Sequence, residues 1–220
     1  MRFRRGDTIV EVTLAITIFS MVAMAGVTLM NMGVSNAQAS LQLVMAREAM
    51  DAQAEALRMI HNSYAANIKS VEANSIASRW TAIEGKAVAN IPKFGNGSTC
   101  QQMISDSTNR FVIDVRNLKN GTSVNPVKTS INNPSTFPRL FYGVEDSNNI
   151  DTSTSFQSAE GLWVQAVKAV KDPKTGAYLA YDFHIRTCWN APGKNVPTTL
   201  GTIVRLYNPE KTASAVQGGV

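Results

Sequence analysis

The chain has 220 residues, and its 21 Lys and Arg against 16 Asp and Glu give a formal net charge of +5. Arg2, Arg4 and Arg5 lie in the first six residues, and the lysines are scattered along the rest of the chain. This distribution gives no electrostatic reason to expect strong nucleic-acid binding. The length leaves room for one compact domain after a long N-terminal helix.

The N-terminal segment joins a basic stretch to a long apolar one. Residues 9–32 are predominantly apolar, and as a helix they would extend about 36 Å, which is enough to cross a bilayer core. Arginines precede this segment and none follows it closely, so we expect the N-terminus in the cytoplasm and the remainder exported across the membrane.

One carboxylate interrupts the apolar segment near its start. Glu11 is followed by residues 12–46, which contain no Asp, Glu, Lys or Arg. A carboxylate inside a membrane helix costs up to about 3 kcal/mol at the bilayer centre and less near the interface. We therefore expect Glu11 to have a partner of opposite charge.

Gly6 and the thirteen residues that follow it (DTIVEVTLAITIF) resemble the class III signal of type IV pilins and of the pseudopilins of type II secretion. The resemblance extends to about residue 35. It implies that a prepilin peptidase cleaves between Gly6 and Asp7, and that the new amine of Asp7 is N-methylated. Glu11 becomes the fifth residue of the mature chain. The family usually has Phe where this chain has Asp7, whose own carboxylate can compete with Glu11 for the amine.

The same resemblance implies a structural subunit of a fimbrium-like filament. Glu11 of one subunit would pair with the N-terminal amine of a neighbour, and the membrane segment would become the filament core. The implied partners are prepilin peptidase, other pilin subunits, an inner-membrane platform protein and an assembly ATPase. The stretch from Glu11 to Phe19 is closer to minor pilins and minor pseudopilins than to shaft subunits. The implied location is the cytoplasmic membrane first and a pilus or pseudopilus at the cell surface afterwards.

The helix is expected to continue well beyond the membrane segment. No proline occurs before Pro92, so the strongest helix breaker is absent from the first part of the chain. Apolar residues recur at steps of three or four, which predicts an amphipathic helix whose apolar stripe packs mostly on its own sheet. These residues are Leu43, Ala46, Met50, Ala54, Leu57, Ile60, Tyr64, Ile68 and Val71.

The second half has the alternation typical of strands. The expected strands are residues 110–116, 139–143, 161–170, 177–188 and 199–207, with a hairpin turn from Asp172 to Gly176. The predicted fold class is α+β, a pilin-like lollipop in which a long N-terminal hydrophobic and amphipathic helix packs on a C-terminal antiparallel sheet. The predicted segments are the leader (1–6), the membrane and filament-core helix (7–33), its amphipathic continuation (34–75), the β-rich domain (76–207) and a flexible tail (208–220).

Cys100 and Cys188 are the two cysteines. In an oxidising exterior, a pair far apart in sequence most simply forms one disulfide, and the alternative is two buried free thiols. Three Trp and several Tyr residues are expected to fill the core or its edges.

Other readings of the chain find less support in the sequence. His61 and His184 lack metal-ligand spacing, so no catalytic residue, metal or cofactor is predicted and the chain is not expected to be an enzyme. The polar loop at residues 146–151 lacks the full calcium-loop pattern, and the glycosylation triplets at Asn96 and Asn120 matter only where that machinery exists. A cleavable secretory signal would be shorter and uncharged. The alternative function is a single-pass membrane-anchored extracellular binding domain that does not polymerise.

Overall fold

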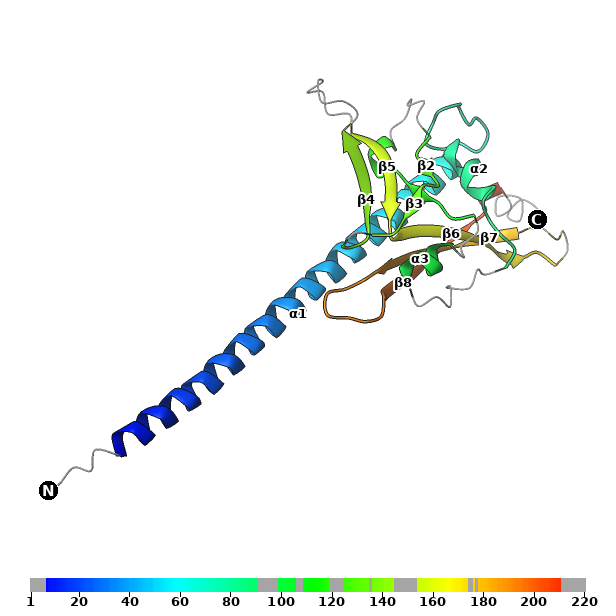
Figure 1. Cartoon of the computed structure of the whole chain (residues 1–220). Coiled ribbons are helices and arrows are strands. Elements are labelled where there is room, and N and C mark those ends of the chain that lie inside the picture. Colours follow the sequence, from blue (N-terminus) through cyan, green and yellow to red (C-terminus); the bar gives the residue numbers. More distant parts are fainter. Residues whose placement is uncertain are drawn as a thin grey trace. The chain divides into compact units, whose positions relative to one another are not determined.

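A computed structural model describes residues 7–90, 99–105, 109–118, 125–134, 136–144, 154–173, 176 and 178–210. The chain divides into two compact units, Met1–Leu41 and Gln42–Val220. The helix α1, Asp7–Ala66, belongs to both units, and all the strands lie in the second (Figure 1). The division after Leu41 lies close to where α1 begins to pack on the sheets, at Leu43 and Ala46.

Helix α1 ends at Ala66, earlier than the predicted residue 75. The Asn67 side chain donates a hydrogen bond to the Ser63 carbonyl (2.8 Å), and the Asn67 backbone N–H donates to Tyr64 (3.1 Å). Asn side chains compete in this way for the last carbonyl groups of a helix. The chain then turns, and Asn74 adopts a positive φ of 63°. Val71, beyond the helix end, is exposed rather than part of the buried stripe.

The rest of the predicted stripe packs in the second unit as expected. Leu43 and Ile68 are partly buried against the core. Gln53 is a buried polar residue that the periodicity did not single out, and it joins the stripe by hydrogen bonds to the backbone of Ile113. The fully or almost fully buried members of the stripe are Ala46, Met50, Ala54, Leu57, Ile60 and Tyr64.

The main sheet has the order β6-β7-β8 and is antiparallel. Its strands are Leu162–Lys171, Tyr178–Trp189 and Thr198–Tyr207, which confirms three of the predicted strands. The turn between β6 and β7 is also confirmed. Gly176 donates its backbone N–H to Asp172 (2.9 Å) with φ at +71°, a conformation that glycine adopts without steric cost.

Two smaller sheets complete the second unit. One has the order β3-β5-β4 and contains Ile131–Asn132, Thr154–Glu160 and Arg139–Val144, and the other pairs β1 (Val112–Ile113) with β2 (Val127–Lys128). β4 and β5 are antiparallel, whereas β3, which the sequence did not predict, pairs with β5 in parallel.

The predicted strand at residues 110–116 is much shorter in the structure. Only Val112–Ile113 forms a ladder, because the Asp114 carboxylate accepts the Arg116 N–H (3.2 Å) and starts the 3₁₀ helix η1, Val115–Asn117. Asp side chains favour such turns over a continued strand. The other short helices are α2, Arg79–Glu84, and α3, Cys100–Ser105.

Aromatic residues fill the core of the second unit on both faces of the main sheet. Trp80, Trp163 and Trp189 are at most 1 % exposed, which confirms their predicted core role. The Trp80 ring lies 5.9 Å from Tyr181 and 6.0 Å from Phe183, centroid to centroid. Trp189 donates its indole N–H to the Gln42 side chain of α1 (3.1 Å). The packing of a helix on largely antiparallel sheets confirms the α+β class.

The first residues of the predicted flexible tail are held in place. Asn208 is buried and donates its backbone N–H to Leu179 (2.8 Å), while the Glu210 carboxylate accepts a hydrogen bond from the Tyr64 hydroxyl. The tail prediction is therefore wrong for residues 208–210, and residues 211–220 lie outside the described part of the chain.

The Gln53 contact predicts a large loss of stability on substitution. Gln53 Nε2 donates to the Ile113 carbonyl (2.8 Å) and Oε1 accepts the Ile113 N–H (2.7 Å). Gln53→Leu leaves both buried backbone groups without a partner, which costs about 2–5 kcal/mol of the free energy of unfolding. Urea unfolding of the full chain in detergent should show this loss, whereas the exposed Gln38→Leu should unfold as the wild type does. Equal midpoints for the two variants would contradict this account.

Candidate functional site

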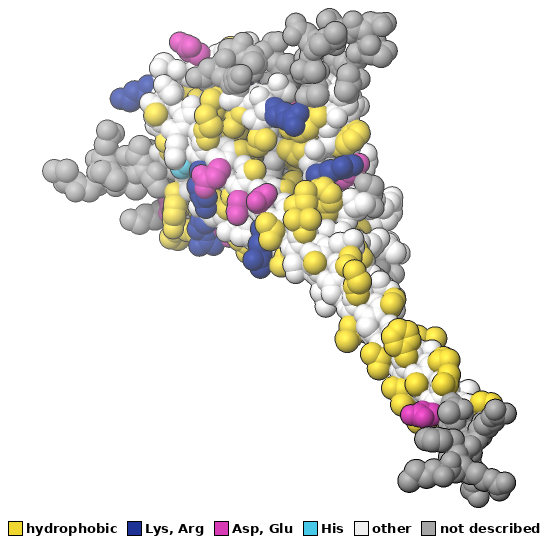
Figure 2. All heavy atoms as spheres, turned by 90° about the vertical axis from the view of Figure 1, so that its left-hand side faces the viewer, with side chains coloured by type: hydrophobic (Ala, Val, Ile, Leu, Met, Phe, Trp, Pro, Cys, Tyr) yellow, Lys and Arg dark blue, Asp and Glu magenta, His cyan; other side chains and the backbone are white. Residues whose placement is uncertain are grey.

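The surface of α1 in the first unit is apolar around its whole circumference. Fifteen large hydrophobic side chains between Ile9 and Val34 are at least half exposed, and Phe19 reaches 74 %. Figure 2 shows hydrophobic side chains covering the visible face of this part of the helix. An apolar stripe that packs on one neighbour covers a single face, so this segment is instead suited to surroundings that are apolar on every side.

The hydroxyl side chains between Ile9 and Val34 donate hydrogen bonds within the helix. The Thr13 hydroxyl donates to the Ile9 or Val10 carbonyl (3.0 Å each), and Thr17 donates to Leu14 (2.7 Å). Ser20 and Thr28 likewise donate to carbonyls four residues earlier. Internal hydrogen bonding lowers the cost of moving hydroxyl groups into a medium without water.

Helix α1 is long and apolar enough to cross a membrane, by length and composition. Its most apolar 18-residue window has a mean hydropathy of 2.1, and none of that window is buried in the protein. The helix continues through Gly26 and Gly33, and each glycine has open space where a Cβ would lie. These properties are consistent with a single-pass membrane anchor.

Glu11 lies on this helix, one turn from its start, with an exposed side chain. Gly6 lies outside the described residues, and Asp7 is described only as the first residue of α1. The structure thus places Glu11 at the beginning of the apolar surface.

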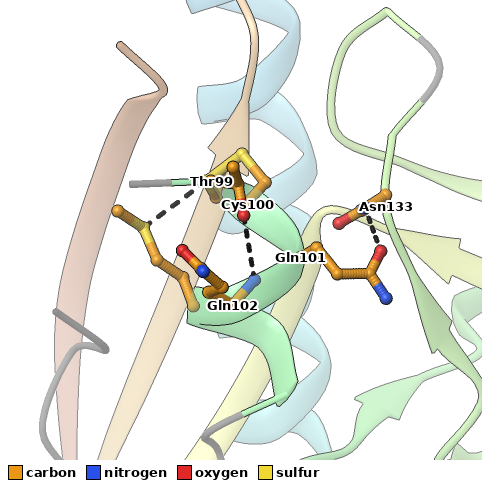
Figure 3. The surroundings of a disulfide bond; sticks show 7 residues. Thr99, Cys100, Gln101, Gln102 and Asn133 are labelled. Carbon is orange, nitrogen blue, oxygen red and sulfur yellow. Dashed lines mark hydrogen bonds between the residues drawn. A yellow bond between two sulfur atoms is a disulfide. The ribbon is translucent and has the colours of Figure 1, made fainter. Parts of the chain in front are cut away.

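Cys100 and Cys188 form a disulfide, with their Cα atoms 5.6 Å apart. The bond links α3 to the central strand β7 of the main sheet across 88 residues of sequence. Figure 3 shows Gln101 of α3 directed toward Asn133, to which it is hydrogen-bonded. The disulfide and this contact hold α3 against the sheets.

The two histidines occupy structural positions. His61 donates Nε2–H to the Tyr207 carbonyl (2.7 Å) and packs edge-on against Trp80. His184 is buried in β7, and burial lowers its pKa below the ordinary value of a histidine. Among the described residues, no three His, Cys, Asp or Glu side chains come together as metal ligands. The polar loop at 146–151 and the glycosylation triplets lie outside that description.

A tyrosine–carboxylate cluster lies where α1 ends, and sequence reasoning missed it. Tyr64 donates its hydroxyl to Glu210, and Tyr181 donates to Glu84. Asn208 also donates to Glu84 (3.4 Å). Burial and the Glu210 carboxylate raise the pKa of Tyr64 to about 12. No spacing along the chain could have predicted these contacts, since Tyr64 and Glu210 are 146 residues apart.

Comparisons of the chain with protein-family models, with curated proteins and with solved structures give no match.

Removal of the disulfide should destabilise the second unit strongly. A cross-link that closes a loop of this length stabilises a protein by about 4 kcal/mol in the chain-entropy model. Replacing Cys100 and Cys188 together by Ala should lower the free energy of unfolding by about that amount, measured by urea unfolding. Dithiothreitol should destabilise the wild type and leave the double variant unchanged. A wild type unaffected by reduction would refute the prediction.

The Tyr64 contact predicts a loss of stability in alkali. The pKa of Tyr64 is raised from 10.0 to about 12 in the folded state, so the folded protein holds the proton more tightly than the unfolded chain does. The resulting stabilisation is complete below pH 10 and decreases as the pH rises toward 12. In urea unfolding between pH 9 and pH 12, wild type should therefore exceed Tyr64→Phe in stability by a margin that shrinks above pH 10. A constant margin would contradict the prediction.

Proposed function

We propose that this chain is a structural subunit of an extracellular filament of the type IV pilus or pseudopilus class. The observation that carries the proposal is the apolar surface of α1 from Ile9 to Val34, exposed on every side, with Glu11 as its single charged residue. The family is proposed from the resemblance of the residues around Gly6 to a class III signal.

The exposed surface requires a non-aqueous environment. Full burial of one large apolar side chain contributes about 1.5–3 kcal/mol, so fifteen such side chains together strongly disfavour a helix in water. A bilayer satisfies this requirement before assembly, and the apolar helices of neighbouring subunits satisfy it afterwards. The same side chains thereby serve as membrane anchor and as filament core.

Glu11 supplies direction to the assembly. Its carboxylate lies near the start of the apolar surface, where an unpaired charge is costly. After cleavage between Gly6 and Asp7, the new N-terminal amine of a neighbouring subunit can pair with Glu11. This contact joins different surfaces of two subunits, and a repeated contact of that kind builds an open helical assembly.

The proposed subunit is inserted into the cytoplasmic membrane with its N-terminus inside and is processed by prepilin peptidase. An inner-membrane platform protein and a cytoplasmic ATPase then move it into the filament. The subunit itself catalyses nothing. The short motif from Glu11 to Phe19 favours a minor subunit over a shaft subunit.

The mature N-terminus tests the proposal against its alternative, a membrane-anchored binding domain that does not polymerise. Mass spectrometry of the protein from its native host should find a chain that begins at Asp7, with or without an N-methyl group. Retention of residues 1–6 in the mature protein would overturn the filament assignment.

Substitutions at Gly6 should act on processing. We predict that Gly6→Ala slows cleavage and that Gly6→Leu blocks it, because the peptidase must accommodate extended backbone at the scissile bond. The ratio of precursor to mature chain on a gel, with time after induction, measures this. Normal processing of both variants would be incompatible with cleavage at this site.

Substitution of Glu11 should act on assembly and leave processing intact. Loss of a charge pair worth about 1.4 kcal/mol corresponds to a tenfold change in an equilibrium constant, so Glu11→Ala should be cleaved normally and incorporated about tenfold less into sheared filaments. Glu48→Ala is the matched control, since Glu48 is an exposed glutamate of the same helix. If Glu11→Ala and Glu48→Ala enter filaments equally, the charge pair does not direct assembly.

A further inference from the structure

The main sheet has two outer edges, and they differ sharply. The outer edge of β6 is occupied by backbone from elsewhere in the chain. Val164 exchanges two hydrogen bonds with Phe111 (2.7 and 3.0 Å). Val88 donates to Ala166 (2.9 Å) and accepts from Lys168 (2.8 Å). In the part of the chain that the structure describes, no strand pairs with the outer edge of β8.

The ladder determines which groups of β8 point outward. Asn208, directly after β8, donates its N–H to the Leu179 carbonyl of β7, so this even-numbered residue bonds to β7. Cys188 of β7 donates its N–H to Gly161, so the even-numbered residues of β7 bond on the side of β6. In an antiparallel sheet, hydrogen-bonded and non-hydrogen-bonded pairs alternate. The even-numbered residues of β8 therefore bond to β7, and the odd-numbered residues direct their N–H and C=O groups to the open edge. The outward set is Thr199, Gly201, Ile203, Arg205 and Tyr207.

Only the end of this edge is covered within the described chain. His61 Nε2–H donates to the outward carbonyl of Tyr207 (2.7 Å). Ile203 remains 59 % exposed and Tyr207 54 % exposed. A row of unpaired backbone groups beside exposed apolar side chains is a template for another strand.

The usual protection against strand addition is weak at β8. Charged side chains on an edge strand normally discourage pairing, and Arg205 is the single charged residue of Thr198–Tyr207. Its guanidinium is engaged by both oxygens of Asp182 on β7 (2.7 and 2.8 Å). The edge therefore presents no uncommitted charge.

A cavity of about 270 Å³ opens beside the same edge, between α1 and β8. Met50 and Leu200 provide apolar walls, while Arg47 and Asp51 contribute opposite charges. Gly201 and Thr202 complete the lining. A strand laid along β8 would direct alternate side chains toward α1, and one of them can enter this cavity.

We infer that the open edge of β8 binds an extended segment of a different subunit of the same filament, as a fourth strand antiparallel to β8. Backbone hydrogen bonds to the outward groups supply affinity, and the cavity accepts one side chain of the segment, whose apolar part lies against Met50 and Leu200. β-Branched or aromatic residues of the segment lie beside Ile203. The subunit partner depends on the proposed function, whereas the strand-binding edge does not.

A second copy of β8 is a poor occupant. Arg47 of α1 lies beside Leu200, and His61 lies beside Tyr207, so α1 and β8 run in the same direction. Antiparallel pairing of two β8 strands about a two-fold axis would make the two α1 helices run in opposite directions. Subunits of one filament share one direction, so a different strand must pair with β8.

Hydrogen exchange of individual amides tests the inference on the full chain. In the purified protein in detergent, Thr199, Gly201, Ile203 and Arg205 should exchange rapidly, and the even-numbered amides of β8 slowly. In sheared filaments these four outward amides should exchange at least about tenfold more slowly than in detergent. Rapid exchange in filaments would overturn the proposal. Protection in detergent that rises with protein concentration would identify a second copy instead and would also overturn it.

Edge variants provide the second measurement. Ile203→Lys places a charge on the open edge, and Thr199→Pro removes an outward N–H at the start of the strand, where proline is tolerated. Val196→Lys is the matched control, since Val196 is 68 % exposed in the preceding loop. Both edge variants should be processed at Gly6 as the wild type is and should enter filaments about tenfold less than the control variant. Equal incorporation of all three would overturn the edge contact.

The two proposals fail in different ways. A wild-type chain that keeps residues 1–6, or that is absent from filaments, refutes the filament function and with it the named partner. A wild-type chain that is cleaved and incorporated, with rapid exchange of the outward amides, refutes the edge contact alone.

Discussion

The second unit depends on one face of α1. The stripe from Ala46 to Tyr64 supplies the apolar surface on which the main sheet packs, and Gln53 in the same stripe binds the backbone of Ile113. A three-stranded sheet of this kind has no stable core alone, because its inner face must be covered by another element. Without the stripe, the aromatic residues around Trp80 would have no helix to pack against.

The same helix meets a different requirement in the first unit. There its apolar residues surround the helix instead of lying along one stripe, and its hydroxyl groups bond to its own carbonyls. One continuous element thus combines a segment that needs an apolar medium with a segment that needs a sheet. In the proposed filament both requirements of α1 are met. The helices of neighbouring subunits provide the apolar medium, and each sheet stays packed on its own helix.

The sequence predicted the elements whose pattern is local. The long helix, the burial of its stripe, the strands β4, β6, β7 and β8 and the turn at Gly176 follow from periodicity and turn chemistry. The errors occur where one side chain competes with a regular element. Asn67 ends α1 early and Asp114 ends β1 early, because each bonds to nearby backbone in place of the next turn or ladder. The strands β2, β3 and β5 escaped prediction, and two of them contain only two residues.

The sequence alone determined the apolar segment, the isolated Glu11 and the resemblance around Gly6, because hydropathy, charge and a linear motif are properties of neighbouring residues. The tertiary structure decided everything that joins distant residues. It brought Cys100 to Cys188 and placed Tyr64 beside Glu210. Among the described residues, it also left the outer edge of β8 without a paired strand, while backbone covers the outer edge of β6. Strand order and edge coverage depend on which segments meet in space, and no local pattern encodes that.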